Sequence, residues 1–181
     1  MNDTKTAIAN GFLALAKRTN PDKITVIDIC RQSNVSRETF YYHFTDKYDL
    51  FKWIYRQSLT ERIRKHSNES SWPLIIEKAI NDAAESSAYF EKLLGKASLE
   101  YSEITYETLY EFYYSELSKS QPDGRLSEEV EAEMFIYLKG GIEYFKHYYK
   151  EHSDMSYKKL AKLIAGAMPE KLSRLWKDCH E

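Results

Sequence analysis

Apolar side chains recur at the spacing of an α-helix along most of this chain. In residues 4–18, Ile8, Phe12 and Leu15 lie four and three positions apart, which places them on one face of a helix. Only 6 glycines and 4 prolines occur among 181 residues, which argues against a turn-rich β architecture. No stretch gives a competing strand pattern. The chain is therefore predicted to be all-α.

Two short helices joined by a tight turn are predicted within residues 25–44. Thr25 can cap the first helix, and Asp28 three residues later completes a capping box. Asn34 tolerates the left-handed backbone of a tight turn, and Ser36 can cap the second helix. This is the pattern of a helix-turn-helix, whose second helix enters the major groove of DNA. The spacing alone also allows a plain helical corner.

The two predicted helices separate into a buried seam and an outward face. The seam is expected to contain Val26, Ile29, Cys30, Val35, Phe40 and Phe44. The second helix then directs outward Ser36, Arg37, Glu38, Thr39, Tyr41, Tyr42 and His43. Ile27 either touches a thymine methyl group or extends the core, and the core is the preferred prediction. Glu38 either accepts a hydrogen bond from a cytosine amino group or restricts Arg37.

Charge is distributed unevenly along the chain. Residues 1–66 contain 12 Lys and Arg against 7 Asp and Glu, whereas residues 67–181 contain 14 against 21. The first part is therefore cationic and the second anionic, within a net charge of −2. Such asymmetry favours a nucleic-acid-binding end, although a solvated cationic face is the plain alternative.

Further helices are predicted after this motif. They cover approximately 45–66, 73–86, 87–96, 98–119, 127–151 and 156–177, and the last is interrupted near Pro169. Ser127 and Ser156 are the expected N-caps of the last two. Residues 67–71 form a polar linker, and residues 121–124 give a strong turn signal.

A longer signature of about 26 positions begins at Thr25 and continues through Ile29-Cys30, Asn34-Val35-Ser36, Thr39-Phe40-Tyr41, His43-Phe44 and Asp46-Lys47 to Leu50. This signature resembles the N-terminal motif of the tetracycline-repressor (TetR) family of bacterial transcription regulators. The resemblance implies a three-helix DNA-binding domain at residues 1–47 and a helical effector-binding and dimerisation domain at residues 48–181. A subgroup that includes regulators of dihydroxyacetone kinase operons is suggested by residues 41–47, 52–54, 140–141 and 168–169.

The resemblance implies DNA contacts at seven positions, namely Thr25, Ser36, Arg37, Thr39, Tyr41, His43 and Lys47. Phosphate contacts are implied for Thr25, Tyr41, His43 and Lys47, and contacts to bases and adjoining backbone for Ser36, Arg37 and Thr39. Three departures are Asn34 in place of the usual turn glycine, Cys30 in place of a usual alanine, and Ile27 at a groove-facing site where polar residues are common in the family. Cys30 is expected to be a packing residue.

The same resemblance implies a homodimer that binds a palindromic double-stranded operator and responds to an unknown small-molecule or protein effector. A repressor is expected. The alternatives are an activator of the dihydroxyacetone-kinase-regulator type and a helical protein-binding adaptor that does not bind DNA.

Aromatic residues are dense in the middle of the chain. The candidate ligand-binding residues are Trp72, Tyr89, Tyr106, Tyr110 and Tyr113, because aromatic rings with polar tips suit an amphipathic small molecule. Ordinary core packing is the alternative for each of them. Gly140 and Gly141 lie inside a predicted helix, where they favour close helix packing or a local break. The family resemblance makes these two glycines candidate dimer-interface residues.

Several classes are excluded or disfavoured by the sequence. It contains no Gly-x-Ser-x-Gly, phosphate-loop or His-Glu-x-x-His motif, so no enzyme and no cofactor is predicted. His147, Glu151 and His152 do not share one helix face, so no metal site is predicted. There is no long uncharged apolar run and no signal-peptide pattern at the start, and the two cysteines are far apart. A cytoplasmic protein without a membrane partner is expected.

Overall fold

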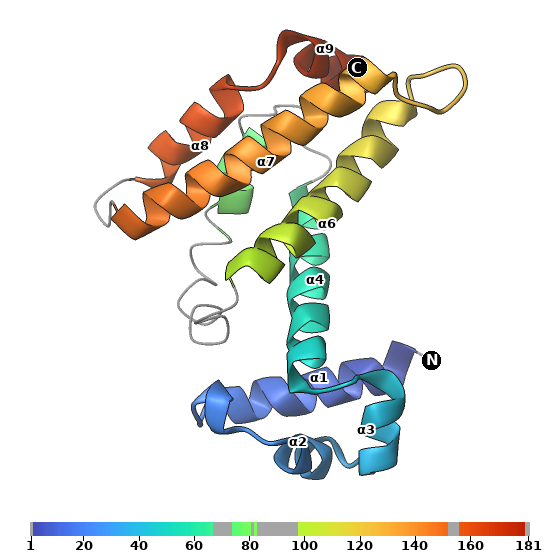
Figure 1. Cartoon of the computed structure of the whole chain (residues 1–181), viewed down its shortest axis with the longest axis vertical. Coiled ribbons are helices and arrows are strands. Elements are labelled where there is room, and N and C mark those ends of the chain that lie inside the picture. The colour runs from blue at the N-terminus through green and yellow to red at the C-terminus, as the bar shows by residue number, and fades with distance from the viewer. Residues whose placement is uncertain (1, 67–73, 81, 83–97, 152–155, 180–181) are drawn as a thin grey trace. The chain divides into compact units, whose positions relative to one another are not determined.

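The computed structural model describes residues 2–66, 74–80, 82, 98–151 and 156–179 (Figure 1). Within these ranges every regular element is helical, which confirms the all-α prediction. The elements are α1 (Asn2–Ala16), the 3-10 turn η1 (Pro21–Lys23), α2 (Val26–Ser33), α3 (Arg37–His43), α4 (Lys47–His66), a helical stretch at residues 74–80, α6 (Ser98–Ser118), α7 (Glu128–Glu151), α8 (Tyr157–Gly166) and α9 (Glu170–Asp178). The expected linker at 67–71, the expected helix at 87–96, Trp72 and Tyr89 lie outside the described residues.

The chain divides into two compact units, and the division falls inside α4 between Ser58 and Leu59. The expected domain boundary after residue 47 lies at the first residue of α4. The N-terminal unit extends further along this helix because Leu50, Phe51 and Ile54 belong to its core.

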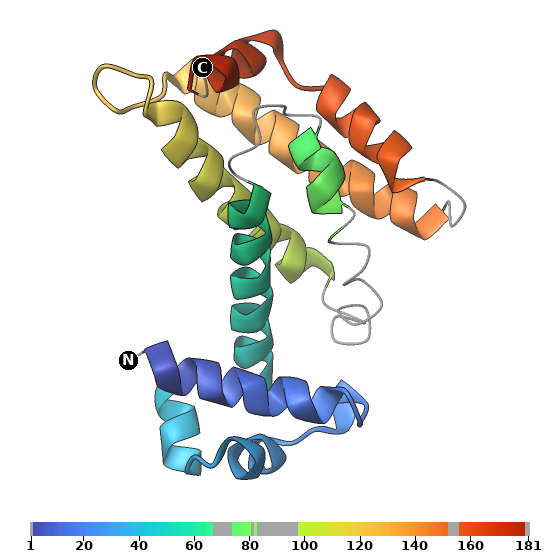
Figure 2. The same cartoon turned by 180° about the vertical axis from the view of Figure 1, so that it is seen from behind.

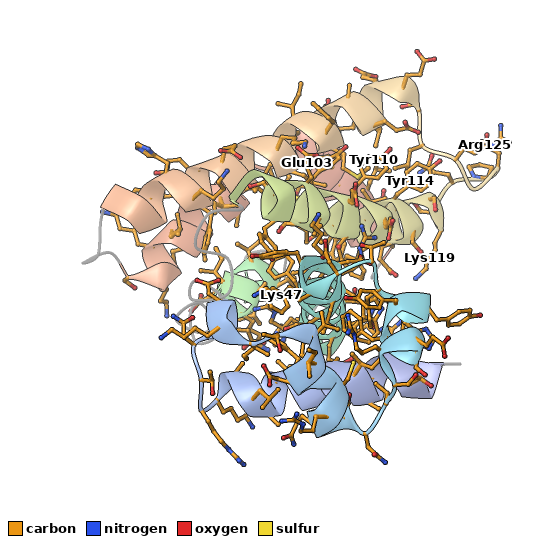
Figure 3. The ribbon with its side chains drawn as sticks, turned by 60° about the horizontal axis from the view of Figure 1, so that its bottom comes forward. Lys47, Glu103, Tyr110, Tyr114, Lys119 and Arg125 are labelled. Atoms are coloured by element: carbon orange, nitrogen blue, oxygen red, sulfur yellow. The ribbon has the colours of Figure 1, made fainter. Side chains whose placement is uncertain are left out.

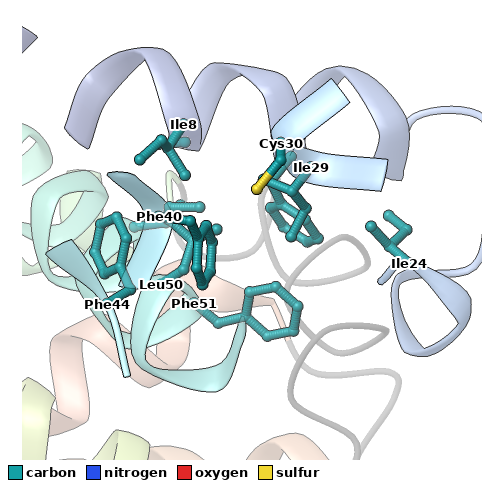
Figure 4. Close-up of a cluster of buried hydrophobic side chains, with 11 residues drawn as sticks. Ile8, Ile24, Ile29, Cys30, Phe40, Phe44, Leu50 and Phe51 are labelled. Carbon is teal, nitrogen blue, oxygen red and sulfur yellow. The ribbon is translucent and has the colours of Figure 1, made fainter. Parts of the chain in front are cut away.

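The core of the N-terminal unit is closed by α1, α2, α3 and the first turns of α4 (Figure 4). Phe12 and Phe51 pack with their ring centroids 4.4 Å apart. The predicted seam is confirmed, because four of its members are buried and Val26 and Val35 are partly buried against them. The four buried members are Ile29, Cys30, Phe40 and Phe44.

Local capping interactions set the start and end of each short helix. The Asp28 amide donates to the Thr25 hydroxyl oxygen at 3.2 Å, and the Thr25 amide donates to the Asp28 carboxylate at 3.0 Å, which confirms the capping box. Asn34 adopts the left-handed conformation at φ 55°, and the Ser36 hydroxyl accepts from the Thr39 amide at 3.0 Å. These interactions direct the chain out of α2 and into α3.

A close approach between α1 and α2 occurs at Gly11. A Cβ atom at this position would lie 2.8 Å from the Cβ of Ser33 and 3.1 Å from its backbone nitrogen. Real Cβ atoms do not tolerate the shorter distance, so the glycine lets α2 lie directly against α1.

The prediction that Ile27 extends the core is wrong. Its side chain is 51% exposed, and it does not belong to the N-terminal core. The reason is geometric, because α2 presents one side to α1 and this side is occupied by Ile29, Cys30 and Ser33. Ile27 lies about 160° around the helix axis from Ile29.

The C-terminal unit has a second core between α6, α7 and α9. Trp176 is buried with its ring centroid 5.6 Å from that of Tyr113. Helix α8 packs on α7, and the two run side by side in both Figure 1 and Figure 2.

The predicted turn before α7 is confirmed, with Gly124 at φ 68°, and so is the break between α8 and α9 at Pro169. Ser156 is the N-cap residue of α8, as predicted, but its side chain makes no cap hydrogen bond, whereas the Ser127 hydroxyl accepts from the Val130 amide at 3.4 Å.

Candidate nucleic-acid interface

Helix α3 is anchored by one buried ring and exposes most of its remaining side chains. Phe40 has no exposed area, and Phe44 at the end of the helix is 2% exposed. Arg37 and Glu38 are exposed, while Tyr41 and Tyr42 are 49% and 75% exposed. The helix therefore carries one cation, one carboxylate and two phenols on a surface of polar and aromatic groups.

Two hydroxyl groups meet at the N-terminal end of α3. The oxygens of Ser36 and Thr39 are 2.9 Å apart, and one hydroxyl donates to the other. Because each hydroxyl has a single proton, the pair retains one proton that can be donated to an acceptor outside the protein. Phosphate oxygens and the acceptor edges of bases are suitable acceptors.

Arg37 lies over the aromatic face of Tyr41, four residues further along α3. The guanidinium carbon is 6.0 Å from the ring centroid, within the range of a cation–π contact. His43 packs edge-on against Tyr42 with ring centroids 5.0 Å apart. The contact with Tyr41 restricts the orientations that the guanidinium group samples, and a guanidinium group can donate two hydrogen bonds to one guanine.

The Thr25 hydroxyl is engaged in the cap of α2. It donates to the Asp28 carboxylate at 2.6 Å. These hydrogen bonds from Thr25 hold the pKa of Asp28 below its usual value. A phosphate contact from the Thr25 side chain therefore requires its hydroxyl to turn away from Asp28.

Lys47 connects the start of α4 to the segment that precedes α2. Its ammonium group donates to the carbonyl oxygens of Asp22 at 2.8 Å and Ile24 at 3.2 Å, and it lies 5.3 Å from the ring centroid of Tyr48. An ammonium group has three donors, so a third hydrogen bond can still reach a phosphate.

Two exposed tyrosines of this unit lie outside the predicted set of contact residues. Tyr42 is on the predicted outward face of α3 but is not among the predicted DNA contacts, and Tyr48 belongs to neither set. Tyr48 is 53% exposed. The exposure of Tyr48 could be predicted from its position next to Lys47 and outside the helix face that carries Leu50 and Ile54.

The candidate ligand-binding residues are not all brought together. Tyr106 and Tyr110 lie side by side on α6 with ring centroids 5.6 Å apart, and the Tyr110 hydroxyl donates to Glu131 at 3.4 Å. Figure 3 labels Tyr110 on this helix. Burial and then the charge of Glu131 raise the pKa of Tyr110. Tyr113 instead belongs to the core, where burial raises its pKa well above the usual value.

The described ranges contain no group of three or more His, Cys, Asp or Glu residues able to hold a metal ion. His147 lies in α7, and His152 is outside these ranges. None of the helices placed in the structure has an apolar stretch long enough to cross a membrane.

An N-terminal helix-turn-helix on a capped three-helix core, followed by a helical unit, is the arrangement typical of helix-turn-helix transcription regulators. Residues 13–54 match the family described as bacterial regulatory proteins, tetR family. The fold is similar to that of a TetR transcriptional regulator from Streptococcus agalactiae 2603V, with a TM-score of 0.62, 21% identity, and coverage of 93% of this chain and 95% of that chain.

The chain is also similar to the HTH-type dhaKLM operon transcriptional activator DhaS of Lactococcus lactis subsp. lactis (strain IL1403), with 26% identity over 90 residues. That alignment covers 50% of this chain and 48% of the relative, so it spans about half the length of each. These matches show that residues 13–54 are similar to the N-terminal part of tetR-family regulators, and that the fold is similar to that of a TetR regulator, as the sequence resemblance predicted.

Proposed function

We propose that this protein is a transcription regulator that binds a palindromic double-stranded DNA operator as a homodimer. The observation that carries the proposal is the outward face of α3, where Arg37 lies over Tyr41 beside the Ser36–Thr39 hydroxyl pair. Arg37 reads a guanine, and the hydroxyl pair contacts bases or the adjoining phosphate. The phosphate contacts come from Thr25, Tyr41, His43 and Lys47.

Support for a dimer comes from an apolar stripe on α7. Ile136 is 69% exposed, Tyr144 is 39% exposed, and Gly140 lies between them at the same spacing of four residues. A Cβ at Gly140 would meet nothing within 4 Å, whereas one at Gly141 would contact Ile164 at 3.4 Å. Gly141 therefore serves packing inside the chain, and Gly140 leaves space for a helix of a second copy. Two-fold symmetry then places the recognition helices about 34 Å apart.

The helical unit is the proposed place of effector control. Support comes from Tyr106 and Tyr110, which are half-buried and present phenol groups along α6. An effector that binds one spacing of the two recognition helices better than another shifts the population toward that spacing. Repression is the proposed outcome. Activation is the second candidate, because the relative DhaS is named an activator.

The test is selection of duplexes from a random DNA pool by the purified protein at near-physiological salt. One enriched palindrome is the expected result. On that palindrome, Arg37→Ala weakens binding by about 1–3 kcal/mol if the guanidinium reads a guanine. Arg125→Ala is the matched control, because it removes an exposed arginine from the C-terminal unit and leaves binding unchanged.

A pool that is not enriched would reject sequence-specific binding and favour the protein-binding adaptor. Unchanged affinity and base preference in Arg37→Ala would reject its role in reading a base. A reporter placed downstream of the selected palindrome then separates the two outcomes for transcription, because a repressor lowers its expression and an activator raises it.

A further inference from the structure

We infer that Ile27 is a specificity-determining residue that contacts the methyl group of a thymine in the operator half-site. This inference rests on the proposed function, because it assigns one base preference to the same DNA-binding surface. It concerns α2, the helix that precedes the recognition helix.

Ile27 differs from every other apolar residue of α2. Ile29 and Cys30 are buried and Val26 is partly buried against the core, whereas Ile27 is 51% exposed. A single exposed isoleucine is common on protein surfaces. What distinguishes Ile27 is its position relative to α3.

That position follows from the contact between α2 and the start of α3. The thiol of Cys30 lies 3.8 Å from the carbonyl oxygen of Ser36, the N-cap residue of α3. The Cys30 side of α2 therefore faces the start of the recognition helix. Ile27 lies about 60° around the axis from Cys30, on the side of α2 between the face that meets α3 and the solvent-exposed face.

The exposed side chains on this side of α2 and at the start of α3 are polar or charged, and they include two arginines. Arg31 lies about 40° around the axis from Ile27 and is exposed, and Gln32 one residue further is exposed as well. On α3, Arg37 follows directly after the N-cap residue that Cys30 contacts. An exposed apolar group on α2, with exposed arginines both on this helix and at the start of α3, suits the DNA major groove, where phosphates flank the base edges.

The chemistry of the major groove identifies the group that Ile27 meets. Three of the four bases present only hydrogen-bond donors and acceptors there, whereas thymine also presents its C5-methyl group. An isoleucine side chain offers neither donor nor acceptor, so it favours the methyl group and disfavours the polar edges. A protein partner fits less well, because a specific interface needs about 800 Å² on each side and one exposed isoleucine among polar and charged residues provides a small part of that.

The test removes the methyl group without changing base pairing. In the selected palindrome, each thymine of one half-site is replaced in turn by deoxyuridine, and the affinity of the full-length protein is measured by fluorescence anisotropy. For the wild-type protein, one replacement is expected to weaken binding roughly fourfold, which corresponds to the burial of one methyl group. In Ile27→Ala the same replacement has no further effect, because the contact is already absent.

Gln32→Ala serves as the matched control, since it changes another exposed residue of α2 and should keep the full response to deoxyuridine. Circular dichroism confirms that Ile27→Ala remains folded, as expected for a half-exposed side chain. If every deoxyuridine weakens the wild type and Ile27→Ala equally, the inference is wrong while the proposed function stands. If no duplex is selected at all, both are rejected.

Discussion

The Thr25 hydroxyl donates a hydrogen bond of 2.6 Å to the carboxylate of Asp28, and the Asp28 amide donates back to the Thr25 oxygen at 3.2 Å. The Thr25 amide also donates to the Asp28 carboxylate at 3.0 Å, so the two side chains together satisfy two amides at the start of α2 that have no partner within the helix. This reciprocal pair also fixes the direction in which the chain enters the helix-turn-helix.

Replacing Thr25 with Ala is expected to lower the free energy of unfolding by about 1 kcal/mol, because the N-cap acceptor is lost. Thr25→Ser retains the hydroxyl, so its free energy of unfolding should remain within a few tenths of a kcal/mol of the wild-type value. Urea unfolding followed by circular dichroism measures both variants. Equal stability of the Ala and Ser variants would show that the cap does not stabilise α2.

The same pair makes stability depend on pH. The pKa of Asp28 is lowered in the folded protein by its hydrogen bonds to Thr25, so its contribution is present above the unfolded pKa of about 3.9 and is lost as pH falls through the folded value. Wild type is therefore expected to be more stable than Asp28→Asn at pH 6, with a smaller difference at pH 3. Urea unfolding at both values measures the difference. If the difference in stability between the two proteins were the same at pH 6 and pH 3, the lowered pKa of Asp28 would be contradicted.

These local interactions explain which parts could be predicted from the sequence. The caps at Thr25 and Ser36 and the turn at Asn34 were predicted correctly because each depends on residues within three or four positions. The exposure of Ile27 contradicts the preferred prediction, although the helical spacing that placed Ile29 in the seam also places Ile27 about 160° away from it. The close approach of Gly11 to Ser33 could not be predicted, because these residues are distant in sequence.

The same distinction applies to the aromatic residues. The helical spacing placed Tyr106, Tyr110 and Tyr113 on one predicted helix, and α6 confirms that helix. The spacing alone does not show that Tyr113 is a core residue that packs against Trp176 of α9, whereas Tyr106 and Tyr110 are half-buried. The pairing of Arg37 with Tyr41 follows from their spacing of four residues, which places both on one face of α3.

Gly11→Ala is expected to destabilise the N-terminal unit. The added methyl group would lie 2.8 Å from the Cβ of Ser33 and close to its backbone, so α1 and α2 must move apart. Overpacking of this kind costs about 1–3 kcal/mol, which outweighs the roughly 1 kcal/mol that alanine gains over glycine inside a helix.

Thermal unfolding measures the effect of Gly11→Ala. Asn10→Ala, at an exposed neighbouring position of α1, is the control and should not destabilise the protein. Combining Gly11→Ala with Ser33→Gly should recover part of the loss, because the closest atom is removed. A Gly11→Ala protein as stable as the wild type would show that the two helices separate at little cost.

Lys139→Gln is expected to lower the free energy of unfolding by about 1 kcal/mol through lost contacts between α7 and α6. The Lys139 ammonium group lies 4.2 Å from the ring centroid of Tyr106 and 2.7 Å from each carboxylate oxygen of Glu103. Lys146→Gln is the control, because Lys146 pairs with Glu143 within one helix at the surface and should contribute less. A double-mutant cycle with Tyr106→Leu should give a coupling of about 0.5–1 kcal/mol, and additive effects would mean that the ring contributes nothing.

Lys47→Gln separates two roles that the structure allows for one ammonium group. Its hydrogen bonds to the carbonyls of Asp22 and Ile24 are structural, whereas a third bond to a phosphate is the proposed DNA contact. A lost phosphate contact in each subunit should lower the slope of log affinity against log salt by about 0.9 per contact. Anisotropy titrations on the selected palindrome at several salt concentrations measure this slope. Lower stability with an unchanged slope would leave Lys47 as a residue that positions the start of α2 and does not itself touch the DNA.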